Sequence, residues 1–283
     1  MLSKYLKVNF SNVLKFPRRK YSLDYIPGGI ENNVLWLSYY QMTGKRNDEC
    51  FRLRDLTTSD EWDIGRLNGY VDHQQVLKLL NGNTGLAPKI YNNTFAAGAT
   101  DAIQTNVANM PIVAQAGNFN HDGFRFVAAS SNYMEITKYN AINILSPILN
   151  IYTNEYGVNV GYSICINTST FNDMQYGAYT SELSGTKQLN TLGSARIASV
   201  LYPPSEKTLV CWNSKSGGGL SININGNIVT GAYGADTMAA NSVYIGCRNN
   251  LGSVSSYLNG QLKTVSISID NLYNYYNILA ARC

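Results

Sequence analysis

The stretch SININGNIV, at residues 221–229, decides the fold class because it contains a β-hairpin signal. At its centre stands Asn225-Gly226. Both central residues of a type I′ turn need a positive φ, which this dipeptide tolerates better than any other. The stretch therefore predicts two antiparallel strands joined by a two-residue turn.

Similar signals continue through the second half of the chain, from residue 120 to the end. A second pair, Asn259-Gly260, predicts another hairpin, and a helix is expected to begin at Asp270. The glycine-rich segment SKSGGGLS (214–221) predicts a flexible connection between two strands. Further short strands, separated by turn residues, are predicted at 124–129, 132–136, 160–167, 196–202, 207–213 and 220–224.

The first half mixes helical and strand patterns. Residues 32–42 show helical spacing of apolar side chains, and residues 72–82 predict a helix that begins at an Asp72 N-cap. In residues 50–56 the side chains alternate strictly between two faces, which predicts a strand. We expect this strand to form a hairpin with residues 61–67. His73 and His121 are the only two histidines, and neither is expected to bind a metal.

These elements predict an all-β protein. We expect a concanavalin A-like jelly-roll sandwich of two antiparallel sheets with a few short helices. The chain has 283 residues and 45% hydrophobic composition, enough for one sizeable core. The sandwich domain is expected to span 32–283, after an N-terminal extension at 1–31.

Positive charge is concentrated in that extension. Excluding the six basic residues before Asp24 leaves 16 basic against 18 acidic residues, so the rest of the chain carries about −2. We therefore expect a basic arm that binds a protein partner, not a nucleic-acid-binding protein or a membrane-inserted one. The arm's cations are Lys4, Lys7, Lys15, Arg18, Arg19 and Lys20.

The cysteines and the start of the chain indicate folding in a reducing cytosol. The five cysteines form no C-x-x-C pair, and we expect buried thiols. Lysines interrupt the first 20 residues, where a signal peptide would need an apolar run. No catalytic triad, multi-histidine metal site or cofactor motif is found, so no cofactor is expected.

Tyrosine is abundant, with 21 residues, and charged residues make up only 14% of the chain. Aromatic faces stack on sugar rings and amides bind hydroxyl groups, so a sheet face rich in Tyr, Trp and Asn suits carbohydrate. The same residues are also good strand and turn formers. Composition leaves both interpretations open.

The stretch KIYNNTFAAGATDAIQTNVANMP (89–111) carries a family resemblance, together with Arg52 and Arg54 and the segment Asp63-Ile64-Gly65. Over about residues 34–283 the order of such segments resembles a family that includes fungal α-L-arabinofuranosidase catalytic domains and many tailed-bacteriophage virion proteins. The resemblance implies a concanavalin A-like (laminin-G-like) sandwich, in which this stretch is a structural strand and loop.

The resemblance also implies where catalytic carboxylates would stand. The family's nucleophile Glu closes a Tyr-Gly-Asn-Ala-Glu run, but here Tyr176-Gly177-Ala178 is followed by Tyr179, and Glu182 is displaced. Its acid/base Asp lies in Ile-Gly-Gly-Asp-Asn, where this chain has Arg248 before Asn249. Arginine cannot donate a proton at neutral pH. We therefore expect no catalytic residues, and a glycan-binding role for Tyr176, Tyr179, Arg248 and Asn249.

The phage branch of the resemblance, together with these observations, implies a non-enzymatic bacteriophage virion protein, a head fibre, decoration or tail-associated protein made in the host cytoplasm. Its arm would bind capsid or tail proteins, and a homo-oligomer would display lectin-like sandwiches for multivalent attachment to host-surface glycans. One alternative is a depolymerase with relocated carboxylates, such as Glu155 with Asp173 or Glu182. Another is a purely structural decoration protein that binds no glycan.

Overall fold

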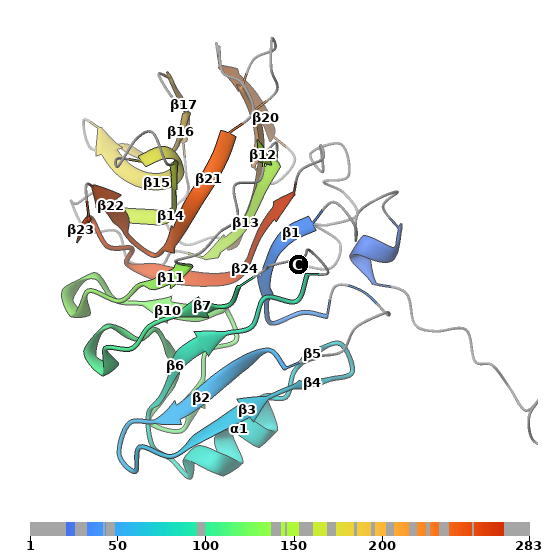
Figure 1. Ribbon diagram of the computed structural model, residues 1–283, viewed down its shortest axis with the longest axis vertical. Helices are drawn as coiled ribbons and strands as arrows, with labels where there is room; N and C mark the ends of the chain where they lie inside the picture. Colours follow the sequence, from blue (N-terminus) through green and yellow to red (C-terminus); the bar gives the residue numbers. More distant parts are fainter. Residues whose placement is uncertain are drawn as a thin grey trace, which may run out of the picture.

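The computed structural model confirms an all-β sandwich (Figure 1). Side chains are described mainly in 21–136, 161–166 and 242–266, and the remaining described segments are backbone strands. The arm at 1–20, the expected helix from Asp270 and residues 271–283 lie outside the described residues. The structure describes residues 21–25, 33–41, 43, 49–94, 100–136, 143–144, 146–152, 161–168, 174–183, 186–193, 196–201, 207–214, 220–224, 227–231, 238–250 and 252–268.

One layer of the sandwich is built around β24 (Gly260–Ser268), which has neighbours along both edges. All of these pairings are antiparallel. On one edge lie β1 (Asn33–Ser38) and β10 (Phe124–Phe126), and on the other lie β13 (Ser146–Tyr152), β18 (Lys207–Ser214), β19 (Leu220–Ile224) and β20 (Asn227–Gly231).

The second layer is built around β21 (Met238–Ile245). β11 (Met134–Ile136) and β12 (Asn143–Ile144) pair with β21 on one side. On the other side follow β14 (Gly161–Thr168), β15 (Met174–Leu183), β16 (Thr186–Gly193) and β17 (Arg196–Leu201).

Strands from the first half of the chain join the two layers into one curled antiparallel sheet (Figure 1). The connection runs from β10 through β8 and β6 to β7 and β11, with β2 and β3 beside β6. These strands are β2 (Phe51–Asp55), β3 (Glu61–Ile64), β6 (Gly85–Ile90), β7 (Ala102–Ile103), β8 (Ile112–Gln115) and β9 (Asn118–Phe119).

Short elements complete the described part of the chain. Two small ladders are formed by β4 (Arg66–Leu67) with β5 (Tyr70–Val71), and by β22 (Arg248–Asn250) with β23 (Ser253–Ser255). Three 3₁₀ turns span Ser22–Tyr25, Val107–Asn109 and Ala128–Ser130. No helix within these described segments is long and apolar enough to cross a membrane.

The expected helix after Asp72 is confirmed as α1 (His73–Leu80). The Asp72 carboxylate accepts a hydrogen bond from the Gln75 backbone N–H at 3.0 Å, and Asn81 ends the helix with φ 46°. Val76 and Leu80 are buried in the main core. The β2–β3 hairpin is also confirmed, with Phe51, Leu53 and Asp55 buried and the arginines between them partly exposed.

The helix expected at 32–42 is wrong, because this segment contains strand β1. Leu35, Trp36 and Leu37 are all buried, so neither face of β1 shows polar alternation. A continuous apolar run of this length fits a buried strand as well as a helix. Pairing with β24, more than two hundred residues away, decides between them.

The two Asn-Gly predictions have different outcomes. β19 pairs with β20 and Ile224 pairs with Asn227, as the first hairpin requires. The hairpin expected at Asn259-Gly260 is wrong, because β23 pairs with β22 and Gly260 begins β24. Neither residue has the positive φ that a type I′ turn needs. The connection at 214–221 does join paired strands, β18 and β19.

Cross-strand registers align one row of residues on the outer face of the sheet, which we call the outer row. Directly paired residues in antiparallel strands share a face of the sheet. Residues at alternating positions, such as Phe51, Ile90 and Ile136, point into the core. The outer row runs from β3 to β21 through Asp63, Arg52, Lys89, Ile103, Glu135 and Tyr244.

Candidate functional site

Glu135 and Tyr244 form the centre of the strongest candidate site. They are directly paired across β11 and β21, and both are partly exposed on the outer row. The Tyr244 hydroxyl donates a hydrogen bond of 2.6 Å to the Glu135 carboxylate. Met134 and Ile136, on either side of Glu135, are fully buried, which fixes the direction of the strand and therefore of this carboxylate.

Two more tyrosines surround this pair. Tyr133 lies two positions before Glu135 on the same face. Its ring centroid is 6.3 Å from that of Tyr257, and the Tyr257 hydroxyl donates a hydrogen bond of 3.2 Å to the Val254 carbonyl oxygen. Both rings are partly exposed. We call Tyr133, Glu135, Tyr244 and Tyr257 the tyrosine–glutamate patch.

The surroundings of Tyr244 and Tyr257 favour their neutral phenol forms. Burial raises the pKa of Tyr244, and the hydrogen bond to Glu135 raises it further, because a phenolate beside a carboxylate is unfavourable. Burial also raises the pKa of Tyr257. The patch therefore offers aromatic faces for stacking, together with phenol and carboxylate oxygens that accept hydrogen bonds, a combination suited to polyhydroxylated ligands.

A short ladder borders the patch. β22 contacts β14 and β15, and β22 and β23 lie beside β14 in Figure 1. Cys165 on β14 is fully buried, and its thiol lies 3.9 Å from the Asn249 carbonyl oxygen. Tyr257 lies two residues after the end of β23, so the ladder brings this tyrosine to the patch. The β22–β23 ladder thus forms one side of the site.

Arg248 and Asn249, two of the expected glycan-binding residues, belong to this border. Arg248 is partly exposed, whereas Asn249 is only 6% exposed. The Asn249 side-chain oxygen accepts a hydrogen bond of 3.1 Å from the Gly252 N–H, so its amide shapes the turn between β22 and β23. The Asn249 side chain therefore stabilises this turn, and of the two residues Arg248 is the more accessible.

Tyr176 and Tyr179 lie in β15, whose backbone alone is described. Tyr176 pairs with the buried Ile166, and Tyr179 pairs with Tyr162. Positions three apart in a regular strand belong to opposite faces. The structure thus brings β15 beside β22 but places these two positions on different faces, and their glycan-binding role stays a prediction.

None of the four residues of the tyrosine–glutamate patch was predicted as a site residue from the sequence. The strand NYMEI (132–136) was predicted, and its alternation could have identified Tyr133 and Glu135 as outward-facing. No strand was predicted around Tyr244. Pairing with Tyr244 could not be predicted, because 109 residues separate it from Glu135.

The remaining sequence expectations concern cysteines and metals. Cys50, Cys165 and Cys247 are buried free thiols, as expected, and burial raises the pKa of Cys50 to about 11. Burial also raises the pKa of Cys247, and high thiol pKa values make Cys50 and Cys247 poor nucleophiles. In the described segments, no three metal-ligating side chains come together. His121 and Asp122 form a turn, also as expected, and the rings of His73 and His121 lie 5.1 Å apart.

No known protein-family model matches the sequence, and no curated protein sequence matches it. Solved structures do match. An arabinofuranosidase complexed with arabinofuranosyl-α-1,2-xylobiose has a TM-score of 0.62 at 12% identity, over 88% of this chain and 63% of that one. A GH54 α-L-arabinofuranosidase soaked with a cyclic sulfate inhibitor has a TM-score of 0.59, with the same identity and coverage. The fold is similar to that of GH54 α-L-arabinofuranosidase.

The similarity to these enzymes concerns the fold alone, because the identity is only 12%, and the chain spans less than two thirds of their length. The CBM40 of Ruminococcus gnavus IT-sialidase, bound to α2,6 sialyllactose, also matches, with a TM-score of 0.41 and 14% identity over 57% of this chain and 97% of that one.

Proposed function

We propose that the protein binds carbohydrate without cleaving it, at the tyrosine–glutamate patch. The observation that carries this proposal is the convergence of Tyr133, Tyr244 and Tyr257 around Glu135 on the outside of the sandwich. Exposed aromatic faces contribute apolar stacking surface at low entropic cost, and the carboxylate accepts hydrogen bonds from sugar hydroxyls. A fold similar to that of GH54 α-L-arabinofuranosidase is compatible with this proposal.

Two features support binding without hydrolysis. A glycosidase of the two-carboxylate type needs a nucleophile or base and a separate proton donor on opposite sides of the scissile bond. Glu135 is the carboxylate that the described residues place in the patch. At the position where the resemblance implies an acid/base Asp, the chain has Arg248, a permanent cation.

Glycan-array binding followed by titration calorimetry tests this function. We expect Tyr257→Ala and Glu135→Gln each to weaken binding of the best glycan about tenfold, because each removes a contact of about 1 to 1.5 kcal/mol. Tyr25→Ala is the matched control, because Tyr25 is 50% exposed and precedes the sandwich. It should leave affinity unchanged.

The same glycans, incubated with the protein, should release no reducing sugar. Release that Glu135→Gln abolishes would overturn the non-enzymatic proposal in favour of a depolymerase centred on the patch. Release that survives this variant would direct attention to Glu155, Asp173 and Glu182, whose side chains lie outside the described residues. Equal binding by wild type, Tyr257→Ala and Glu135→Gln would remove the patch as the site.

We also infer a finer setting, in which many copies of the sandwich are displayed on a bacteriophage particle. Support comes from the sequence resemblance to tailed-phage virion proteins and from the basic residues gathered before Asp24. In this setting the arm binds a capsid or tail protein, the chain forms a homo-oligomer, and weak glycan contacts add up through multivalency. A decoration protein without glycan binding is the alternative within the same setting.

Particle co-sedimentation tests this setting. The full chain should bind purified phage capsids or tails of its own source, and a chain lacking residues 1–20 should lose that binding while keeping its glycan affinity. Loss of binding at high salt is expected as well, because the six arm cations act through screened charge. Equal sedimentation of both chains would remove the arm as the anchor.

A further inference from the structure

We propose that the ligand is a neutral, linear glycan chain that extends from the tyrosine–glutamate patch along the outer row to Tyr91. This inference rests on the proposed function and names the ligand class of the same site. The observation is the continuity of the outer row: each residue from Tyr244 to Asp63 is directly paired with the next across six strands.

The length of the row suits several sugar units. Tyr244 on β21 and Asp63 on β3 are five strand steps apart, and strands are spaced about 4.8 Å, so the row is about 24 Å long. A monosaccharide would cover only the tyrosine–glutamate patch. Ile103, midway along the row, is 46% exposed and offers an apolar surface between the two polar ends.

A second aromatic group stands at the far end of the row. Tyr91 follows β6, and its hydroxyl donates a hydrogen bond to the Asp63 carboxylate. The Lys89 ammonium lies 4.6 Å from the centroid of the Tyr91 ring. Burial and the Asp63 hydrogen bond raise the pKa of Tyr91 to about 12, so its hydroxyl stays protonated. Aromatic residues at both ends and an apolar residue between them form a strip for a chain of rings.

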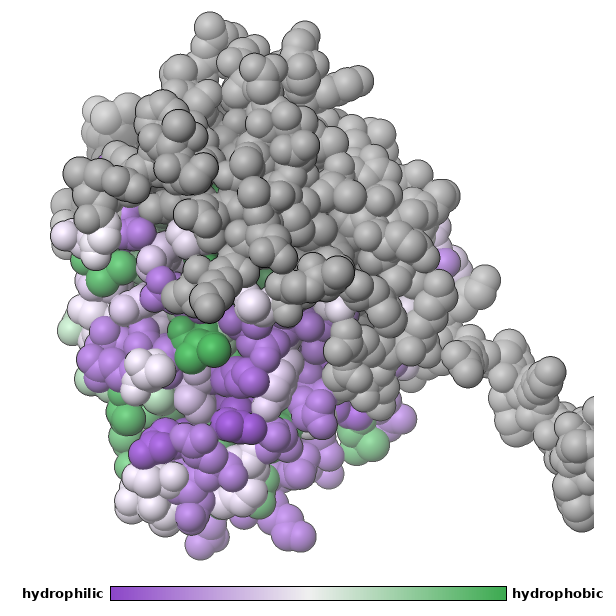
Figure 2. Space-filling view, in the orientation of Figure 1, coloured by the Kyte–Doolittle hydropathy of each residue, from purple (hydrophilic) through white to green (hydrophobic). Residues whose placement is uncertain are grey.

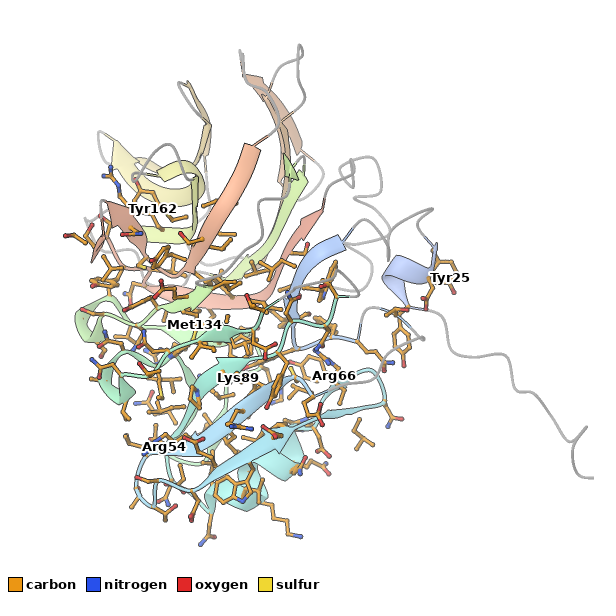
Figure 3. All side chains as sticks on the ribbon, viewed as in Figure 1. Tyr25, Arg54, Arg66, Lys89, Met134 and Tyr162 are labelled. Carbon is orange, nitrogen blue, oxygen red and sulfur yellow. The ribbon has the colours of Figure 1, made fainter. Side chains whose placement is uncertain are left out.

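Charge pairing along the strip favours a neutral chain. Arg52 contacts Asp63 at 2.8 Å, and Lys89 contacts Asp101 at 2.9 Å, so each cation already has a carboxylate partner. Beside them, Arg54 contacts Glu61 at 2.7 Å. Figure 2 shows a largely hydrophilic lower surface with isolated hydrophobic spots, and Figure 3 labels Arg54 and Lys89 on this part of the molecule. An anionic chain would compete with these carboxylates, whereas hydroxyl groups can accept and donate hydrogen bonds around them.

Chain-length dependence tests the inference. Using a neutral glycan that the wild type binds, we expect the hexasaccharide to bind about tenfold more tightly than the disaccharide. Tyr91→Ala should remove this gain and leave disaccharide affinity unchanged, and Tyr91→Phe, which keeps the ring, should retain the gain. A uronic acid chain of equal length should gain nothing over its own disaccharide.

The possible outcomes separate this inference from the proposed function. If Tyr257→Ala weakens both ligands but length and Tyr91→Ala have no effect, the patch binds a short epitope and the strip is overturned. A length gain that is larger for the anionic chain would overturn the neutral ligand class. If neither ligand responds to Tyr257→Ala, the proposed function itself fails. Unchanged denaturation midpoints of the variants exclude unfolding as the cause.

Discussion

Gly123→Ala is expected to destabilise the protein by at least about 4 kcal/mol, a large fraction of the usual stability of a domain. A Cβ at Gly123 would lie 2.4 Å from the carbonyl carbon and oxygen of Leu262 and 2.5 Å from the Lys263 nitrogen. All three atoms are backbone atoms of β24, the strand that β1, β10 and β13 flank, so they cannot rotate away. The φ of Gly123, +123°, adds strain for any other residue.

Gly252→Ala is the matched control for this prediction. Gly252 also has a positive φ, +87°, but no atom lies within 4 Å of the position its Cβ would take. The Gly252→Ala substitution should lower the free energy of unfolding by about 1 kcal/mol, through backbone strain alone. Urea denaturation of both variants measures the difference. Similar midpoints for the two would show that β24 moves to accommodate the added carbon.

Asp55→Ala is expected to lower the free energy of unfolding by about 3 kcal/mol, because it removes a buried carboxylate that accepts three hydrogen bonds. Asp55 is only 2% exposed at the end of β2. One carboxylate oxygen accepts hydrogen bonds from the backbone N–H groups of Thr57 and Thr58, at 2.7 and 3.1 Å, and the other accepts one from the Asn83 amide at 2.9 Å. This residue therefore joins the β2–β3 turn to the segment after α1.

The same carboxylate makes stability depend on pH. Burial alone would raise the pKa of Asp55, but the hydrogen bonds from Asn83, Thr58 and Thr57 lower it overall. Because the folded-state pKa lies below the unfolded value of about 3.9, the unfolded state binds more protons in that interval. The stabilisation is complete above the unfolded pKa and is lost as pH falls through the folded pKa.

Denaturation curves from neutral pH to the acid range measure both effects. Asp55→Asn should show a smaller loss of stability on acidification than the wild type. Asp60→Ala removes the same charge from an exposed position in the same turn. Its free energy of unfolding should stay within about 0.5 kcal/mol of the wild-type value at neutral pH. Unfolding of Asp55→Ala and Asp60→Ala at the same urea concentration would contradict this prediction.

Local patterns in the sequence predicted the elements whose contacts are close in sequence. The β2–β3 hairpin followed from alternation at Phe51 and Leu53, and α1 followed from the cap at Asp72. These predictions held because the deciding interactions lie within a few residues of one another. The helix expected at 32–42 and the hairpin expected at Asn259-Gly260 failed because distant strands decide the structure there. β1 pairs with β24, and Gly260 at the start of β24 pairs with Phe126 of β10.

For the candidate site, too, local patterns predict some features and distant strand pairings decide the others. Alternation determines that Glu135 in β11 and Tyr133, just before this strand, share a face of the sheet. It likewise places Lys89 on the outer face of β6. It does not determine which strands lie next to β11, because a strand's edges can pair with any strand of suitable length. Tyr244 and Tyr257, more than a hundred residues further along, reach Glu135 and Tyr133 only through the register of β11 with β21 and the position of the β22–β23 ladder.

The sequence by itself determined that this protein is an all-β sandwich, because the period of its apolar residues and its turn dipeptides are local properties of the chain. Only the tertiary structure decided which outward-facing residues become neighbours. That choice depends on strand order and register, which are set by burial of the whole core and not by any single segment.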